Sequence, residues 1–189
     1  AQEAAEKIQD GSTLCTIGMT LVSASESILK AIEKRFETVG HPADITLVHS
    51  CGQSDRKDGI QHLAHEGLVK RIIGSHWGLQ PRWMEMIANS QVEAYCLPQG
   101  QIAQLYRSMA CGLPGKMSKV GLGTFIDPRV EGGKMNDRTK PLPDIVDILE
   151  YSGEEYMFYK EIPLDTVLIR GTAVSYTHLR AHETPEHLV

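Results

Sequence analysis

The sequence predicts an α/β fold, an open and mostly parallel sheet covered by helices on both faces. Short apolar segments rich in β-branched residues alternate four times with segments of helical pattern. This alternation is typical of a parallel sheet, because each crossover between parallel strands needs the length of a helix. A chain of 189 residues, 41% of them hydrophobic, is long enough to bury the core of one such domain. We therefore expect a three-layer sandwich.

The individual elements follow from local patterns. The spacing of apolar residues predicts an amphipathic helix over residues 23–36, and Pro81 fits the first turn of a helix over residues 81–88. The segment 147–156, with Ser-Gly-Glu-Glu at its centre, is expected to be a turn between strands. Strands are expected at residues 13–18, 44–49, 69–75, 92–97, 156–160 and 166–170, and the other helices at residues 1–9, 59–66 and 101–110.

Charge and composition exclude several classes of function. The formal net charge is −5 and the basic residues form no patch interleaved with aromatic side chains, so we expect no nucleic-acid partner. No apolar run approaches the roughly 18 to 20 residues that span a bilayer, so we expect no membrane partner. The four cysteines lack Cys-x-x-Cys spacing and fit reduced thiols. These features predict a soluble, cytoplasmic protein.

The last residues of the chain differ in character from the rest. Residues 174–189 contain His178, His182 and His187 but no apolar period for a helix or a strand. This segment resembles the translation of a synthetic sequencing adapter, so we expect a foreign tail outside the fold. The domain is expected to cover residues 1–173. The three histidines are not expected to bind a metal.

Small and polar residues follow each of the first four predicted strands. Ligands gather at the carboxyl ends of the strands in open α/β sheets, so these clusters mark the expected site. The clusters are Gly18–Thr20, Ser50–Gln53, Gly74–His76 and Pro98–Gly100.

A glycine-rich loop over residues 119–136 is the other candidate for ligand contact. Gly121, Gly123, Gly132 and Gly133 would let backbone amides approach a ligand, since a side chain would block that approach. The loop is not a nucleotide fingerprint, because it has neither the spacing of the dinucleotide motif nor a Gly-Lys-Ser/Thr phosphate cradle.

Gln99 is the side chain best placed for chemistry. It ends a strand and precedes a helix, so its amide can project into the mouth of the sheet beside the amides of a helix start. A neutral donor beside backbone N–H groups suits a developing oxyanion. The alternative is that Gln99 caps its helix or bonds a neighbouring loop.

Other reactive groups carry less weight. His49 and Cys51, with His76 nearby in space, could suggest a thiol nucleophile, but no third group is evident to orient a base. Glu131 stands beside flexible glycines without a paired acid or base, so we expect it to be solvated.

His62 and His65 could form part of a metal-binding face with Glu66. No other ligand set accompanies them in the sequence. Surface or capping roles are therefore expected for both histidines, and no metal is predicted.

Several motifs together resemble the family I coenzyme A transferases, in particular their amino-terminal (α) half. The block after Val120 is the most specific, and the resemblance covers about residues 1–173, so the domain is expected to be truncated. The motifs are Asp10–Thr13, Leu47–Ser50, Leu63–Arg71, Leu97–Gly100, Val120–Arg129, Glu131–Lys134, Ile162–Asp165 and Leu168–Thr172.

The resemblance implies an enzyme that moves CoA between an acyl-CoA and a short-chain acid such as acetate, propionate or a 3-keto acid. In this family a glutamate of the carboxyl-terminal (β) half forms a glutamyl-CoA intermediate. No residue here matches its motif, so we expect the isolated chain to be inactive. CoA is a substrate and no permanent cofactor is implied. The implied partners are the β half and further copies of the enzyme.

The resemblance places Gln99 at the acyl site. Contact with substrate is predicted for Gly18, Met19, Thr20, Gly52, Gln53, Gly100, Gly121, Gly123 and Thr124.

The chain departs from the family pattern after its first strand. The family has Gly-Gly-Phe and Gly-x-Pro where this sequence has Ile17–Met19 and Ser23–Ser25. This difference bears on the shape of the acyl pocket and hence on the substrate.

Two alternatives share this superfold, a small-molecule binding module and a sugar-phosphate isomerase. An isomerase would need a carboxylate base at the strand ends, and the four clusters contain none.

Overall fold

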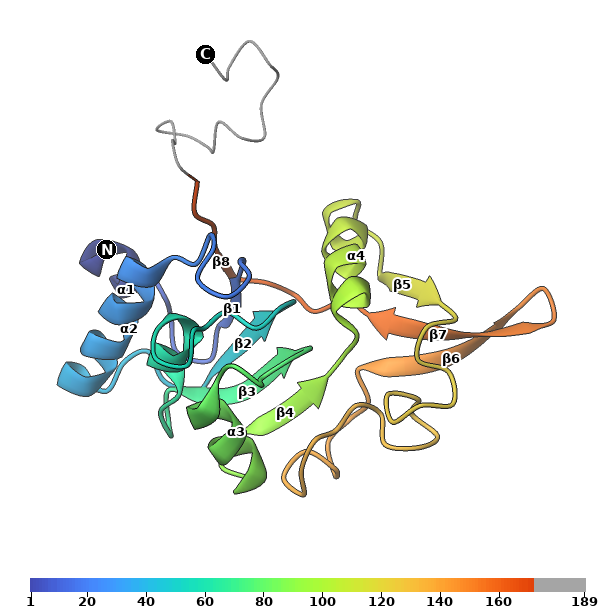
Figure 1. Cartoon of the computed structure of the whole chain (residues 1–189). Coiled ribbons are helices and arrows are strands. Elements are labelled where there is room, and N and C mark those ends of the chain that lie inside the picture. The colour runs from blue at the N-terminus through green and yellow to red at the C-terminus, as the bar shows by residue number, and fades with distance from the viewer. Residues whose placement is uncertain (172–189) are drawn as a thin grey trace, which may run out of the picture.

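The computed structural model describes residues 1–171 and contains a five-stranded parallel sheet (Figure 1). Its strand order is β4-β3-β2-β1-β8, and every neighbouring pair runs parallel. The strands are β1 (Thr13–Thr16), β2 (Ile45–His49), β3 (Val69–Gly74), β4 (Glu93–Cys96) and β8 (Thr166–Leu168). The predicted α/β class is confirmed. The expected foreign tail at residues 174–189 lies outside the described residues.

Two layers cover the two faces of this sheet (Figure 1). Successive strand residues point to opposite faces, so Leu14 joins one core and Cys15 the other, and Ile72 and Ile73 divide in the same way. The first face packs against α1 (Gln2–Glu6), α2 (Glu26–Val39), the 3₁₀ helix η1 (Gly59–Leu63) and α3 (Pro81–Ala88). The second face packs against α4 (Gln99–Ala110) and a smaller sheet.

Helix α2 shows how local chemistry sets the boundaries. The prediction began this helix at Ser23, which was wrong because Ser23 has a φ of 62°, outside the helical region. Ser25 stands instead at the N-cap position. The helix ends at Val39, and the capping residue Gly40 has a φ of 76°, which permits its amide to donate to the carbonyl of Phe36.

A second, antiparallel sheet is the main feature that the sequence analysis missed. It has the order β5-β7-β6, formed by β5 (Gly115–Ser118), β6 (Val146–Tyr151) and β7 (Glu154–Lys160). The turn expected over residues 147–156 is confined to Ser152 and Gly153, which both have positive φ. That combination is typical of a two-residue hairpin turn. The rest of the segment is strand, so that expectation was wrong.

Within residues 1–171, no helix combines the length and the apolar character needed to cross a bilayer.

His49, the last residue of β2, is a fully buried polar group with both ring nitrogens in use. Its Nδ1 lies 2.7 Å from the carbonyl oxygen of Cys51, and its Nε2 lies 3.1 Å from the indole Nε1 of Trp77. The indole N–H can only donate, so Nε2 accepts and Nδ1 carries the proton. Burial lowers the pKa of His49 to about 4. The imidazole is therefore neutral and fixed in one tautomer.

This buried imidazole should make the protein less stable in acid. A histidine with a depressed folded pKa stabilises the fold above its unfolded value of 6.5, and that contribution is lost as the pH falls toward 4. The free energy of unfolding should drop by about 3 kcal/mol over this range, as a shift of this size implies. Urea titrations at several pH values measure the drop.

The variant His49→Gln should lack this part of the pH dependence. The exposed His76 provides a matched control, and His76→Gln should keep most of the slope. Equal slopes in the wild type and His49→Gln would contradict the expectation.

Candidate functional site

The loops at the carboxyl ends of β1, β2, β3 and β4 lie along one edge of the parallel sheet and are joined to one another. The amide of Thr20, after β1, donates to the carbonyl of Gly52, after β2, at 2.8 Å. The hydroxyl of Ser75, after β3, donates to the carbonyl of Ser50 at 2.5 Å. The amide of Leu97, after β4, donates to the carbonyl of Gly74 at 2.9 Å. The predicted clusters therefore form one continuous rim.

Gln53 and Gly18 contribute to the shape of this rim. The side chain of Gln53 is fully buried, and its Nε2 donates to the carbonyl of Thr16 at 2.8 Å. Gly18 has a φ of 150°, and a Cβ there would lie 2.8 Å from the carbonyl oxygen of Val22. Both residues thus support the loops, while Met19 beside them is 58% exposed.

Gly52 permits a close approach of the third loop. A Cβ at Gly52 would lie 2.7 Å from Nδ1 of His76. A larger residue would therefore push the loop after β3 away from the rim. Gly52 was predicted to contact substrate, and because glycine has no side chain, such a contact would be made by its backbone atoms.

Gln99 and Gly100 form the first turn of α4, directly after Pro98 at the N-cap position. Both residues are exposed, and a Cβ at Gly100 would have no atom within 4 Å. No side-chain hydrogen bond joins Gln99 to another residue in the described part of the chain. Its amide is therefore available beside the free N–H groups of a helix start, which favour negative charge.

The first half of the glycine-rich loop is organised around Asp127. This buried carboxylate accepts from the amide of Gly123 at 2.9 Å and from Nη2 of Arg129 at 2.8 Å. The hydrogen bonds from Arg129 hold the pKa of Asp127 well below its usual range. The carbonyl of Gly121 accepts from the hydroxyl of Thr124 at 2.8 Å. Among the described residues, no hydrogen bond joins this turn to the rim, so substrate contact here stays a prediction.

The second half of the loop reaches the parallel sheet instead. Gly133 accepts from the amide of Cys96 at 2.7 Å, and Met135 donates to the carbonyl of Ala94 at 3.0 Å, so the loop pairs antiparallel to β4. A Cβ at Gly133 would lie 2.6 Å from the carbonyl oxygen of Cys96. The glycine density of the sequence was the signal for this contact, but it did not show which glycine makes it.

The groups that could have supplied a nucleophile are placed unfavourably. His49 is neutral and uses both nitrogens, so it is no base for Cys51. Glu131 is exposed on a turn, as expected for a solvated carboxylate. A solvated carboxylate keeps its hydration and is a weak nucleophile.

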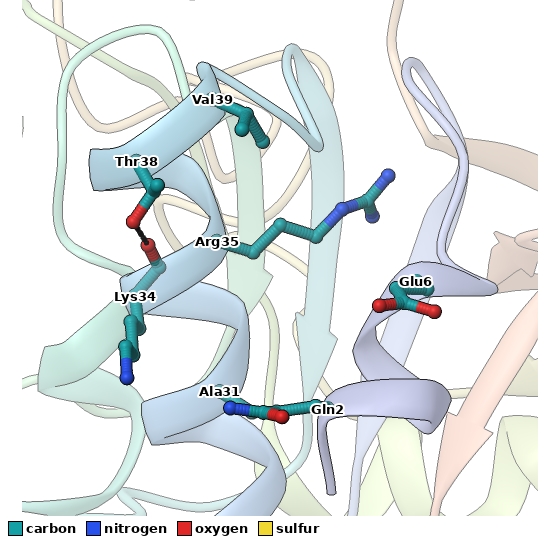
Figure 2. A pocket seen from close by; sticks show the side chains of 7 residues that line it. All are labelled: Gln2, Glu6, Ala31, Lys34, Arg35, Thr38 and Val39. Carbon is teal, nitrogen blue, oxygen red and sulfur yellow. Dashed lines mark hydrogen bonds between the residues drawn. The ribbon is translucent and has the colours of Figure 1, made fainter.

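The surface has one groove within the helical layer and another close to the carboxyl ends of β1 and β8. A groove of about 270 Å³ lies between α1 and α2 (Figure 2), where Arg35 extends from α2 and donates to the carbonyls of Ala5 and Ile8 at the end of α1. This groove belongs to the helical layer. A second groove, of about 390 Å³, lies between the first turn of α2 and residues 169–171 after β8. The strand order reverses between β1 and β8, and open α/β sheets bind ligands at such a reversal.

Comparisons with known proteins identify relatives of this chain. The family model described as "Coenzyme A transferase" matches residues 1–178. The chain is 42% identical over 173 residues to the caffeate CoA-transferase of Acetobacterium woodii, covering 91% of this chain and 33% of that protein. It is 30% identical over 116 residues to the acetoacetyl-CoA:acetate/butyrate CoA transferase alpha subunit of Clostridium acetobutylicum, covering 61% of this chain and 46% of that one.

A solved structure shares the fold. The acyl-CoA transferase of Escherichia coli O157:H7, a thioester complex with CoA, is similar with a TM-score of 0.86 and 36% identity, over 90% of this chain and 33% of that one. The chain spans about a third of the length of the first curated relatives that it matches. These matches show that the chain belongs to the coenzyme A transferase family.

Proposed function

We propose that this chain forms one wall of an active site that transfers CoA between an acyl-CoA and a free short-chain carboxylate. The observation that carries the proposal is the similarity to CoA-transferases over nine tenths of the chain, together with a rim that presents Gln99 at a helix start. Acetate and butyrate occur in the names of relatives. CoA is a substrate in this proposal, and no permanent cofactor takes part.

The proposed chemistry runs through a glutamyl-CoA intermediate. A glutamate carboxylate attacks the acyl carbon, releases the CoA thiolate and forms a mixed anhydride. The thiolate then attacks the glutamyl carbonyl and releases the first acid, and the second acid recovers CoA by the reverse steps. Each attack creates a tetrahedral oxyanion, which the Gln99 amide and the first N–H groups of α4 would stabilise.

The attacking glutamate is proposed to lie in a second half of the enzyme. Glu131, the residue nearest to a candidate here, is exposed and does not match the family motif. One relative is named an alpha subunit, which supports a division of the active site between two parts. The four cysteines are unpaired, which supports a reducing compartment such as the cytoplasm.

A fusion protein tests the division of the active site. Residues 1–173 are joined to the part of the Acetobacterium woodii caffeate CoA-transferase that follows its aligned third. The fusion should transfer CoA from acetyl-CoA to propionate, and hydroxylamine should inactivate it only after acyl-CoA is added, because hydroxylamine cleaves a glutamyl thioester. This chain alone should show no turnover.

Turnover by the chain alone would contradict the placement of the glutamate. A soluble fusion that transfers no CoA to any acid would contradict the proposed function. Transfer to caffeate and not to propionate or acetate would contradict the proposed acid class.

The role of Gln99 is tested in the same fusion. Gln99→Ala should lower kcat about 100-fold with little change in KM, as loss of one oxyanion donor does. Gln104→Ala is the matched control, because Gln104 is exposed on the same helix and should be replaceable without effect. Steady-state kinetics with acetyl-CoA measure both. Equal kcat values for the two variants would overturn the assignment.

A further inference from the structure

We propose that Glu26, Asp58 and His62 form a binding site for a divalent transition metal of the zinc type. One ligand atom from each residue lies within 4.8 Å of the others. Nε2 of His62 is 2.8 Å from Oε1 of Glu26 and 3.3 Å from Oδ1 of Asp58. Zinc at 2.0–2.2 Å from tetrahedral ligands holds them about 3.3 Å apart. The separation between Nε2 of His62 and Oδ1 of Asp58 already matches this value, and Oε1 of Glu26 lies 0.5 Å closer to Nε2 (3.3 Å against 2.8 Å).

The surroundings of these three residues resemble the outer shell of a metal site. Nδ1 of His62 faces Oε2 of Glu33 at 2.5 Å, so the imidazole can donate to a carboxylate while Nε2 binds the metal. The second oxygen of Glu26 accepts from the amide of Gly59 at 2.9 Å. The second oxygen of Glu33 contacts Nε2 of His65 at 2.9 Å. Metal-binding histidines and carboxylates are oriented by partners of this kind.

The charges of the site also suit a dication. Glu26 and Asp58 together carry two negative charges, and His62 would bind as the neutral imidazole, so a bound dication would be neutralised. At present the ammonium of Lys30 lies 3.0 Å from Oε1 of Glu26 and 3.2 Å from Oδ1 of Asp58. Its side chain is 53% exposed and flexible, so it can leave toward solvent. Lys30 therefore occupies the place of a cation and competes with the metal.

The fold brings together residues that are far apart in the sequence. Glu26 and Glu33 lie seven positions apart on α2, and Asp58 and His62 belong to the N-cap and the body of η1, which packs against that helix. The sequence alone suggested His62 and His65 with Glu66, for which surface or capping roles were expected. A local pattern cannot pair these histidines with carboxylates from α2. Among the described residues, Glu66 is not part of this set.

Cobalt(II) is the probe for this site, because its visible absorption reports the number and geometry of its ligands. The full chain carries His178→Asn, His182→Asn and His187→Asn, so that the tail histidines do not contribute. One equivalent of cobalt should bind with an intense visible band, and added zinc should abolish the band.

Variants in the same background identify the ligands. His62→Gln should weaken cobalt binding at least 100-fold, and Glu33→Gln about 10-fold to 100-fold, as removal of outer-shell partners does. Lys30→Met should tighten binding, because it removes the competing cation and no ligand. His41→Gln, an exposed histidine elsewhere on the surface, is the control and should bind as the background does. Circular dichroism confirms that each variant is folded.

Two results would overturn the proposal. One is the absence of saturable cobalt binding at millimolar concentration in both the background and Lys30→Met, which would leave an ion-pair cluster only. The other is binding that His62→Gln and His41→Gln alter equally, which would show adventitious binding to surface histidines.

Discussion

The central sheet is buried on both faces, and this constraint governs the rest of the molecule. The four strands β1 to β4 supply apolar side chains to two different cores, as Leu47 and Val48 do in β2. A slip of one residue in the pairing would exchange the two sets, so the register is strongly specified. The strands of such a sheet end along one edge. The rim of loops at that edge is therefore a direct result of the parallel arrangement of the strands.

Polar contacts between the loops make this rim a firm support for the exposed Gln99 side chain. The buried amide of Gln53 bonds the carbonyl of Thr16, and the His49 imidazole is held between Cys51 and Trp77. The amide nitrogen of Gln53 and both ring nitrogens of His49 are therefore occupied by hydrogen bonds within the fold and are not free to contact a ligand. Gln99, in contrast, is exposed at the start of α4. A fixed backbone with one available amide donor is suited to stabilise charge that arises during a reaction, because its groups need little rearrangement.

Local patterns predicted the helices on the first face of the parallel sheet and α4 on its second face, but not the antiparallel sheet beside α4. The helix over residues 81–88 was predicted with its exact bounds because Pro81 marks its start. Strand β6 was not predicted, because charged Asp147 and Glu150 interrupt its apolar residues and because part of its surface is exposed. Val146 of this strand is buried in the core on the second face of the parallel sheet, together with residues far away in the sequence, which a local pattern cannot show.

The candidate site shows the same division. The strand-end clusters were predictable because topology places them on one edge, and the family followed from motifs with specific spacing. The partner of each glycine in the loop was not predictable, since Gly133 meets β4 through contacts between distant segments.

The pairing of the glycine-rich loop with β4 determines which edge of the parallel sheet is left unpaired. It shields the β4 flank, whereas within residues 1–171 β8 has a strand on its β1 side alone. An unpaired strand edge is a template for pairing with a further strand, so the two edges of this sheet differ in the pairing that they permit.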